Sequence, residues 1–267
     1  MEKLDIPKFD TKKELFKFLV ENEHSLIAQK CASIKHADGF ASNLTLIERD
    51  FVVGKSAASA NPGEVKVKAV INTTNIMDSH DDVHIKGWAN NSLKENKRIM
   101  MLQEHKSREF DKIIASGEDL KAYMKDYTWK ELGYDIEGST EALVFDATIK
   151  QVRNPFMFEQ YKNKYVDNHS VGMQYVKIRL AINDTDFTAA KEVWDQHIND
   201  IANKQQAEEQ SYFWAVYEAK VIEGSAVPNG SNPFTPTLET KNIKLVGGEN
   251  ETIQSEKMRA IIKFLNS

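Results

Sequence analysis

Runs of alternating or continuous hydrophobic residues mark a series of strands through the middle of the chain. Residues 65–71 alternate between apolar and polar side chains, and residues 142–149 are rich in β-branched and aromatic ones. Other apolar runs end at His105, extend over 170–182 and cover 212–222. Helical patterns do not alternate regularly with these runs. The pattern predicts an α+β fold whose core is a mainly antiparallel β-sheet or barrel, flanked by helices.

The helical patterns lie mostly outside that core. Asp10 or Thr11 can cap a first helix, whose apolar face must pack on the main domain, a second subunit or another protein. The residues of that face are Leu15, Phe16, Leu19 and Val20. A long helix is predicted over about 186–206, between two core strands, and a last helix over 252–265.

These patterns divide the chain into three parts. Residues 1–60 are expected to form an N-terminal helical extension, and residues 61–238 the central domain, with a helical insertion at about 185–207. Residues 239–267 are interpreted as a linker and a C-terminal helix. In the strand over 170–182 the hydrophobic period shifts near Tyr175, which predicts a β-bulge or burial of both faces.

Composition narrows the class of protein. The chain has 267 residues, of which 41% are hydrophobic and 28% charged, as in ordinary globular proteins. A net charge of −5 argues against nucleic-acid binding through a basic surface. The single cysteine, Cys31, excludes an internal disulfide and fits a reducing compartment. No apolar run has the roughly 18 residues of a transmembrane helix, and the acidic start does not resemble a signal peptide. We therefore expect a cytosolic protein that binds neither membrane nor nucleic acid.

Ser170 stands where a long strand begins, and Gly172 follows it closely. A serine at a strand edge beside a glycine can expose its hydroxyl near backbone amides, which is one geometry that a nucleophile requires. A serine before a strand is more often an ordinary turn residue. Two other residues strengthen the catalytic interpretation: His105 ends a buried apolar run, and Glu223 follows the strand over 212–222.

The segment from Asp78 to His84 carries two histidines and three aspartates, which raises the alternative of a metal-dependent hydrolase. His80 and His84 would be its ligands. No second cluster follows at the ligand spacing of zinc enzymes. We interpret the segment as a polar loop whose aspartates hydrogen-bond the backbone, and we expect no metal and no cofactor.

Four short blocks occur in order through about residues 65–236. They are a loop with a Gly–aromatic step (Asp78, Asp82-Val83, Gly87-Trp88, Ser92-Leu93), an apolar run ending in histidine (101–105), a Ser–aliphatic–Gly–apolar block (170–173) and a strand ending in Glu-x-Ser-x-Val, with Pro and Asn behind it (223–229). In this order the blocks resemble the prohead (procapsid maturation) protease family of tailed phages, distant relatives of the herpesvirus assemblins.

The chain departs from the family pattern in several places. Lys106 follows the histidine where the family often has an aspartate, and Met173 ends the serine block where Phe or Tyr is usual. Pro228-Asn229 comes earlier than the family's Pro-Ala-Asn. The predicted helix over 186–206 looks like an insertion. These departures bear on activity more than on fold.

The resemblance implies an assemblin-like prohead protease fold and a serine endopeptidase that cuts scaffold and capsid-protein segments. It assigns Ser170 as the nucleophile, His105 as the general base and Glu223 as the third member. His169 is a rival for the third role because assemblins use a second histidine there, but adjacent side chains on a strand point to opposite faces. Glu218 is a further rival, although it lies in mid-strand.

Backbone amides around Ser170, Val171 and Gly172 are the expected donors to the oxyanion. Arg179 is an alternative because assemblins use an arginine to orient the oxyanion or a bridging water. It lies nine residues from Ser170, roughly 30 Å along an extended strand. A bend or bulge alone would not close that gap.

The resemblance further implies capsid and scaffold proteins as substrates, self-association into a dimer or larger assembly, and a location in the host cytoplasm, inside the immature procapsid. The exposed termini are candidate sites of self-cleavage. The alternative function is a catalytically idle protein of the same fold that serves in capsid assembly or as a scaffold component. An idle relative would typically lack Ser170 or His105, and both are present.

Overall fold

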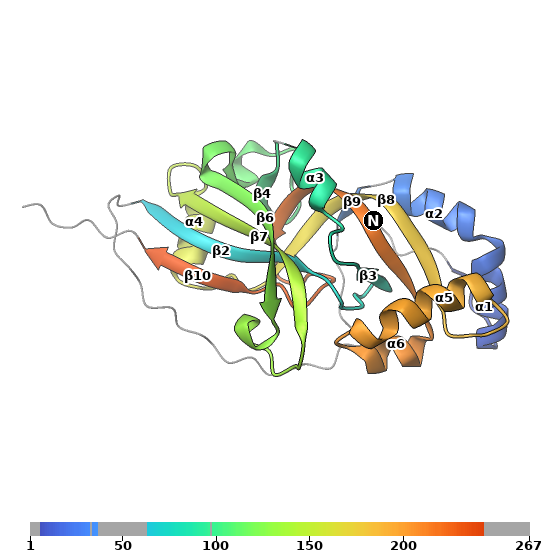
Figure 1. The fold of residues 1–267 in the computed structure, drawn as a ribbon. Helices are drawn as coiled ribbons and strands as arrows, with labels where there is room; N and C mark the ends of the chain where they lie inside the picture. Colours follow the sequence, from blue (N-terminus) through green and yellow to red (C-terminus); the bar gives the residue numbers. More distant parts are fainter. Residues whose placement is uncertain (1–5, 33, 37–62, 97, 243–267) are drawn as a thin grey trace, which may run out of the picture.

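Two β-sheets with helices around them make up the computed structural model, which describes residues 6–32, 34–36, 63–96 and 98–242 (Figure 1). The helices are α1 (Lys12–Glu21), α2 (Glu23–Ala32), α3 (Asn90–Glu95), α4 (Pro155–Lys162), α5 (Thr188–His197) and α6 (Lys204–Gln210). The strands are β1 (Lys35–His36), β2 (Glu64–Thr73), β3 (Asp82–His84), β4 (Met100–Gln103), β5 (Ile113–Ser116), β6 (Leu120–Thr128), β7 (Ser139–Lys150), β8 (His169–Ile182), β9 (Tyr212–Ala226) and β10 (Thr237–Asn242).

The first sheet has the strand order β1-β8-β9-β4-β5, and β3 also pairs with β9. β9 lies between β8, which runs antiparallel to it, and β4, which runs parallel to it. Ala226 of β9 is therefore in register with His169 on one side and Gln103 on the other. This register brings the start of β8, the end of β9 and the end of β4 to one place.

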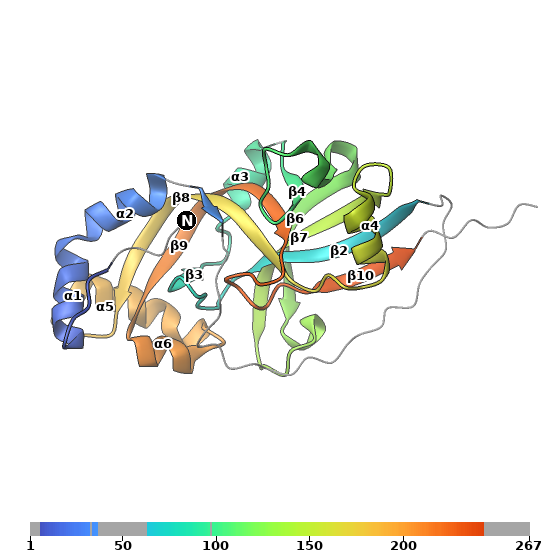
Figure 2. The same ribbon diagram turned by 180° about the vertical axis from the view of Figure 1, so that it is seen from behind.

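The second sheet, β10-β2-β7-β6, is antiparallel throughout and packs against the first. Gly224 of β9 allows a close approach: a Cβ there would lie 2.6 Å from the Phe145 ring and 2.8 Å from Ile71. The hydrophobic core therefore lies behind this part of β9. Helix α4 contacts β2, β7 and β10 (Figure 2).

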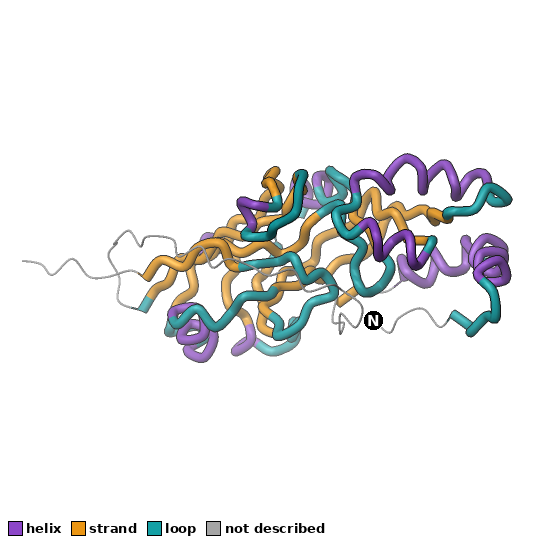
Figure 3. The backbone as a smooth tube through the Cα atoms, turned by 90° about the horizontal axis from the view of Figure 1, so that it is seen from below, coloured by secondary structure: helices purple, strands orange, loops and turns teal. Residues whose placement is uncertain are grey.

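The second half of β8 and the first half of β9, which pair with each other, are covered by helices on both faces. Ile178 and Trp214 belong to one hydrophobic cluster with Phe16 and Leu19 of α1. The alternate face, with Phe213, packs against Trp194 of α5. Figure 3, from below, shows these helices gathered at one end of the strands. The sequence left three possible partners for the apolar face of the first helix: the main domain, a second subunit or another protein. In the structure this face packs on the main domain.

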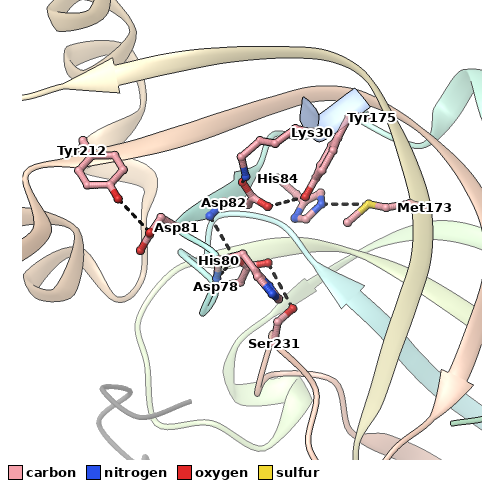
Figure 4. A network of polar contacts seen from close by, with 10 residues as sticks. All are labelled: Lys30, Asp78, His80, Asp81, Asp82, His84, Met173, Tyr175, Tyr212 and Ser231. Carbon is pink, nitrogen blue, oxygen red and sulfur yellow. Dashed lines mark hydrogen bonds and ion pairs between the residues drawn. The ribbon is translucent and has the colours of Figure 1, made fainter. Parts of the chain in front are cut away.

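A buried charge pair fixes α2 to the central domain (Figure 4). Lys30 Nζ lies 2.6 Å from Asp82 Oδ1, and the two side chains are 5% and 0% exposed. The Tyr175 hydroxyl donates to the other Asp82 oxygen. Burial raises the pKa of Tyr175, and the Asp82 carboxylate raises it further, so this hydroxyl keeps its proton. The Lys30 ammonium also lies 5.5 Å from the centroid of the Trp214 ring.

Several predictions from the sequence are confirmed. The fold is α+β with sheets rich in antiparallel pairs, although the described strands close no barrel. Thr11 caps α1, and Glu14 completes a capping box. The register of β8 against β9 shifts twice between Tyr175 and Ile178, as the change of period indicated. Within the described ranges, no helix is both long and apolar enough to cross a membrane.

Other predictions need correction. The single helix over 186–206 is two helices, α5 and α6, joined by a 3-10 turn (Ile198–Asp200). The strand predicted over 212–222 does not end before Glu223, because β9 continues through Ala226. The interpreted linker after residue 238 begins with strand, since β10 extends to Asn242. The helix predicted over 252–265 falls outside the described residues.

Candidate active site

His105 and Glu223 form the centre of the candidate site. His105 Nδ1 lies 2.5 Å from Glu223 Oε1, and both side chains are buried. Either partner can carry the proton in this contact, and a neutral His105 would donate from Nδ1 to the carboxylate. A carboxylate on Nδ1 fixes the tautomer that leaves Nε2 able to accept a proton. This is the orientation that a general base requires.

A tight turn after β4 places His105. Glu104 and His105 both have left-handed backbone conformations, with φ of 51° and 58°. Such values are uncommon for residues other than glycine and often occur at functional sites. Hydrogen bonds to β9 hold the turn: the Glu104 amide donates to Ala226 O, and the His105 amide donates to Ser225 Oγ.

Ser225 is a member of the site that the sequence analysis did not single out. Its hydroxyl donates to Glu223 Oε2 at 2.7 Å and accepts from the His105 amide at 3.0 Å. One buried hydroxyl thus orients both the carboxylate and the backbone of the histidine. A signal was present in the sequence, because residues two apart on a strand share a face and Glu223 is two residues from Ser225.

Gly172 makes room for Glu223. The two residues are in register across β8 and β9, and a Cβ on Gly172 would lie 2.0 Å from Glu223 Oε1. The carboxylate oxygen that contacts His105 therefore rests directly on the backbone of β8. The imidazole is consequently held over the same face of this strand pair.

Ser170 lies on that face. It is in register with Ser225, two residues along β8 from Gly172, with no register shift between them. Residues two apart on a strand are about 7 Å apart and point the same way. Ser170 is 3% exposed and His105 is 9% exposed. The sheet thus brings the three predicted residues Ser170, His105 and Glu223 to one buried place, each from a different strand or strand end.

His169 does not compete for the third role. Its Nδ1 lies 2.8 Å from Thr235 O and its Nε2 lies 3.0 Å from the Tyr161 hydroxyl. A carbonyl oxygen only accepts, so Nδ1 carries the proton and the tyrosine donates to Nε2. Burial raises the pKa of Tyr161, which keeps that donor protonated. His169 is therefore a buried structural histidine on the opposite face.

The remaining candidates have other positions. Arg179 is exposed and in register with Ala215, far along β8 from Ser170, so the structure does not bring it to the site. The aliphatic side chain of Val171 is buried in the core and has no donor, so Val171 could contribute only its backbone amide. Glu218 accepts a hydrogen bond from Asn91 and is in register with Lys177, away from Gly172.

The histidine-rich loop is organised by its aspartates, as interpreted from the sequence (Figure 4). Asp78 Oδ1 accepts from the amides of His80 and Asp82. The His84 ring contacts Met173 Sδ at 3.3 Å and packs on Trp88. Among the described residues, no group of three or more potential ligands is arranged to hold a metal ion.

The chain matches no family model, no curated protein and no solved structure. Its chemistry must therefore be judged from the geometry. A hydroxyl, an imidazole and a carboxylate on one buried sheet face are suited to nucleophilic attack with general-base assistance.

Proposed function

We propose that this protein is a serine endopeptidase with Ser170 as nucleophile, His105 as general base and Glu223 as the carboxylate that orients the base. The observation that carries the proposal is the buried contact of 2.5 Å between His105 Nδ1 and Glu223 Oε1, over the strand pair that holds Ser170. A buried carboxylate on an imidazole costs desolvation, so the arrangement is better explained by catalysis than by stability.

The proposed reaction follows from the positions of these groups. His105 Nε2 takes the proton of the Ser170 hydroxyl as its oxygen attacks the scissile carbonyl carbon. The imidazolium that forms is stabilised by Glu223, whose second oxygen is already satisfied by Ser225. The same imidazolium then gives the proton to the leaving amine. Water attacks the resulting acyl-enzyme in the same way, with His105 as base, and the proton returns to the Ser170 oxygen as the acyl group leaves. Backbone amides around Ser170, Val171 and Gly172 are the proposed oxyanion donors.

The proposed biological role is maturation of a phage procapsid. It is supported by the order of the four sequence blocks, three of which meet at the candidate site. Under this proposal the substrates are scaffold and capsid proteins, the enzyme acts inside the immature procapsid in the host cytoplasm, and it self-associates. The alternative, an idle assembly protein of the same fold, is disfavoured because the contact between His105 and Glu223 has no evident use in a scaffold.

Self-cleavage tests the proposal directly. Purified wild type and Ser170→Ala proteins are incubated side by side, and intact mass is followed over time. We expect the wild type to lose terminal segments and the variant to stay whole, because only the wild type has the nucleophile. A Ser107→Ala variant, which changes an exposed serine close to His105 in sequence, serves as the matched control and should behave as wild type.

Two results would count against the proposal. Cleavage by Ser170→Ala at the wild-type rate would reject Ser170 as nucleophile. If neither protein is cut, both are incubated with co-expressed scaffold and capsid proteins, and an absence of cleavage there would favour the idle assembly protein.

A further inference from the structure

A pocket of about 560 Å³ opens where β4 and β9 end and β8 begins, close in sequence to the candidate triad, although none of the three triad residues lines it. Its wall includes Glu104, which precedes His105, and Ala226, which follows Ser225. Asn168, two residues before Ser170, completes this side. Two residues of extended strand span about 7 Å. A peptide whose scissile bond lies at Ser170 would therefore place side chains within a few residues of that bond in the pocket.

The pocket is lined mainly by apolar side chains. The buried ones are Tyr134, Met157, Ala226 and Val227. Phe156 and Tyr165 stand at the wall with 59% and 72% of their surface exposed. Exposed large apolar side chains grouped at a concave site are typical of a binding surface, because leaving them in water is unfavourable. The volume lies within the usual range of ligand sites.

The charged side chains that line the pocket are all negative. Glu104 and Asp167 belong to its lining, and none of its described lining residues is lysine or arginine. Glu104 also pairs with Lys106 at 3.0 Å, outside the lining. A carboxylate entering the pocket would lose water and meet like charge, which is unfavourable on both counts.

We propose that this pocket is the specificity subsite of the peptidase: it binds a large apolar side chain, aromatic or long aliphatic, within about three residues of the scissile bond, and it rejects aspartate and glutamate there. The inference rests on the proposed function, since it takes the peptide to be the substrate of Ser170. In this proposal the buried Met157 and Val227 contact the bound side chain from within, and the exposed Phe156 and Tyr165 contact it from the rim.

The test uses exposed rim residues, so that the fold is preserved. The double variant Phe156→Ala/Tyr165→Ala removes both rim aromatics. Phe110→Ala is the matched control, because Phe110 is 91% exposed and does not line the pocket. Each protein digests casein, and mass spectrometry maps the cuts. We expect wild-type cuts to be enriched in large apolar residues and depleted in acidic ones near the bond. The double variant should lose about tenfold in kcat/KM at those sites, as expected for lost apolar contacts, while Phe110→Ala is unchanged.

A binding measurement separates this inference from the proposed function. The inactive Ser170→Ala protein is titrated with two capped pentapeptides, one with phenylalanine between alanines and one with glutamate instead. We expect only the phenylalanine peptide to bind, and the rim double variant on the Ser170→Ala background to weaken it about tenfold. Equal binding of the two peptides, or no effect of the rim variant, would overturn the subsite even if casein is cut. Selective binding without any cutting would support the subsite while rejecting the peptidase.

A charge variant gives an independent readout. Asp167→Asn removes one of the two lining carboxylates with little change in shape. We expect it to improve binding of the glutamate peptide relative to the phenylalanine peptide, because one like charge is gone. An unchanged ratio would contradict the part of the inference that concerns charge.

Discussion

Each oxygen of the Glu223 carboxylate has its own partner: His105 Nδ1 contacts one, and the Ser225 hydroxyl donates to the other. Both oxygens are buried, so each lost donor would leave a desolvated acceptor. The carboxylate cannot rotate freely, because the backbone of Gly172 lies directly beneath it. At this scale the site is held by packing and by hydrogen bonds together.

Glu223→Gln tests the orienting role of the carboxylate. The amide keeps the shape but stabilises an imidazolium poorly and can donate to Nδ1, which favours the wrong tautomer. We expect kcat to fall by about 10⁴-fold, the loss seen when a triad carboxylate is neutralised. Glu218→Gln, on the same strand, is the control and should retain activity. Peptide cleavage near the wild-type rate by Glu223→Gln would make Glu223 a structural residue.

Gly172→Ala tests the close contact beneath the carboxylate. The new Cβ would overlap Glu223 Oε1, so the glutamate must move away from His105. We expect a loss of about 1–3 kcal/mol in the free energy of unfolding, as for other overpacked sites, and a large fall in kcat of the folded protein. Gly224→Ala is the matched control, because its Cβ would overlap Phe145 on the opposite face. It should lower stability similarly while sparing kcat, so equal kcat losses would contradict the role of Gly172.

Individual residues of the site differ in how far the sequence could predict them. His105, Ser170 and Glu223 could be named from motif order and strand ends. The role of Gly172 depends on the register of β8 against β9, which pairs it with Glu223 more than fifty positions away. The role of Ser225 depends on the pairing of β4 with β9, which brings His105 to it. No local pattern specifies these pairings: the spacing of two residues places Ser225 on the face of Glu223, but its contact with His105 and the position of Gly172 under the carboxylate come only from the fold.

At the scale of elements, α2 is bound to the domain by the contact between Lys30 and Asp82. Burying such a pair costs much of what the attraction returns, so the pair contributes little net stability compared with an apolar replacement. Removing only one member of the pair lowers the stability strongly, because the other member is left charged and buried. Lys30 lies in the part predicted as an extension, and Asp82 lies in the central domain. This contact therefore couples the two parts, alongside the apolar packing of Leu26 and the hydrogen bond from Gln174 to Cys31 O.

A double-mutant cycle measures that coupling. Lys30→Met should lower the free energy of unfolding by about 3–5 kcal/mol, because Asp82 is left buried without its counter-ion. Adding Asp82→Asn should recover much of this loss, since the buried charge is then removed as well. Urea unfolding of the two single variants and the double variant gives the interaction energy. Additive effects of the two changes would show that the contact does not couple α2 to the domain.

The elements themselves were predicted unevenly. Strands with a clear apolar run, such as β2, β7 and β8, were found with nearly correct bounds. The end of β9 was missed because Gly224 and Ser225 resemble turn residues, although pairing on both sides keeps them extended. The helix over 186–206 was predicted as one because its apolar spacing continues, whereas the chain turns at Ile198–Asp200 to keep α6 on the strands.

At the scale of the whole molecule, the choice between one closed barrel and two open sheets was not accessible from the sequence. It depends on which distant strands pair, and both arrangements satisfy the same alternation of apolar and polar residues. In the structure β9 takes β3, β4 and β8 as neighbours, and β2 takes β7 and β10. Hydrophobic periodicity records which face is buried but not which strand lies alongside.

The stability of the whole molecule should depend on pH through His197. Burial lowers its pKa, Arg179 adds to the lowering, and Asp200 opposes it. The unfolded chain therefore binds the proton at higher pH than the folded one, so stability is lost as pH falls through the unfolded value of about 6.5. We expect this contribution to reach at most about 1.4 kcal/mol per pH unit.

Urea unfolding between about pH 5 and pH 8 checks this expectation. His197→Gln can keep a hydrogen bond to Tyr217 and removes the titration, so its stability should fall less than that of the wild type on acidification. His24→Gln, at an exposed histidine, should follow the wild type. Identical pH profiles for His197→Gln and wild type would contradict the assignment.

The place of β9 in the sheet sets when the candidate site can exist during synthesis. The ribosome makes β4 with His105 first and β8 with Ser170 later, and β9 is made only after both. Since β9 lies between them, a nascent chain that ends before β9 has neither Glu223 nor the strand that spaces the other two. Pairings over such long sequence separations also form slowly. Under the proposed function, the chain should therefore leave the ribosome inactive, so that its own emerging segments and neighbouring nascent proteins are not cleaved before folding is complete.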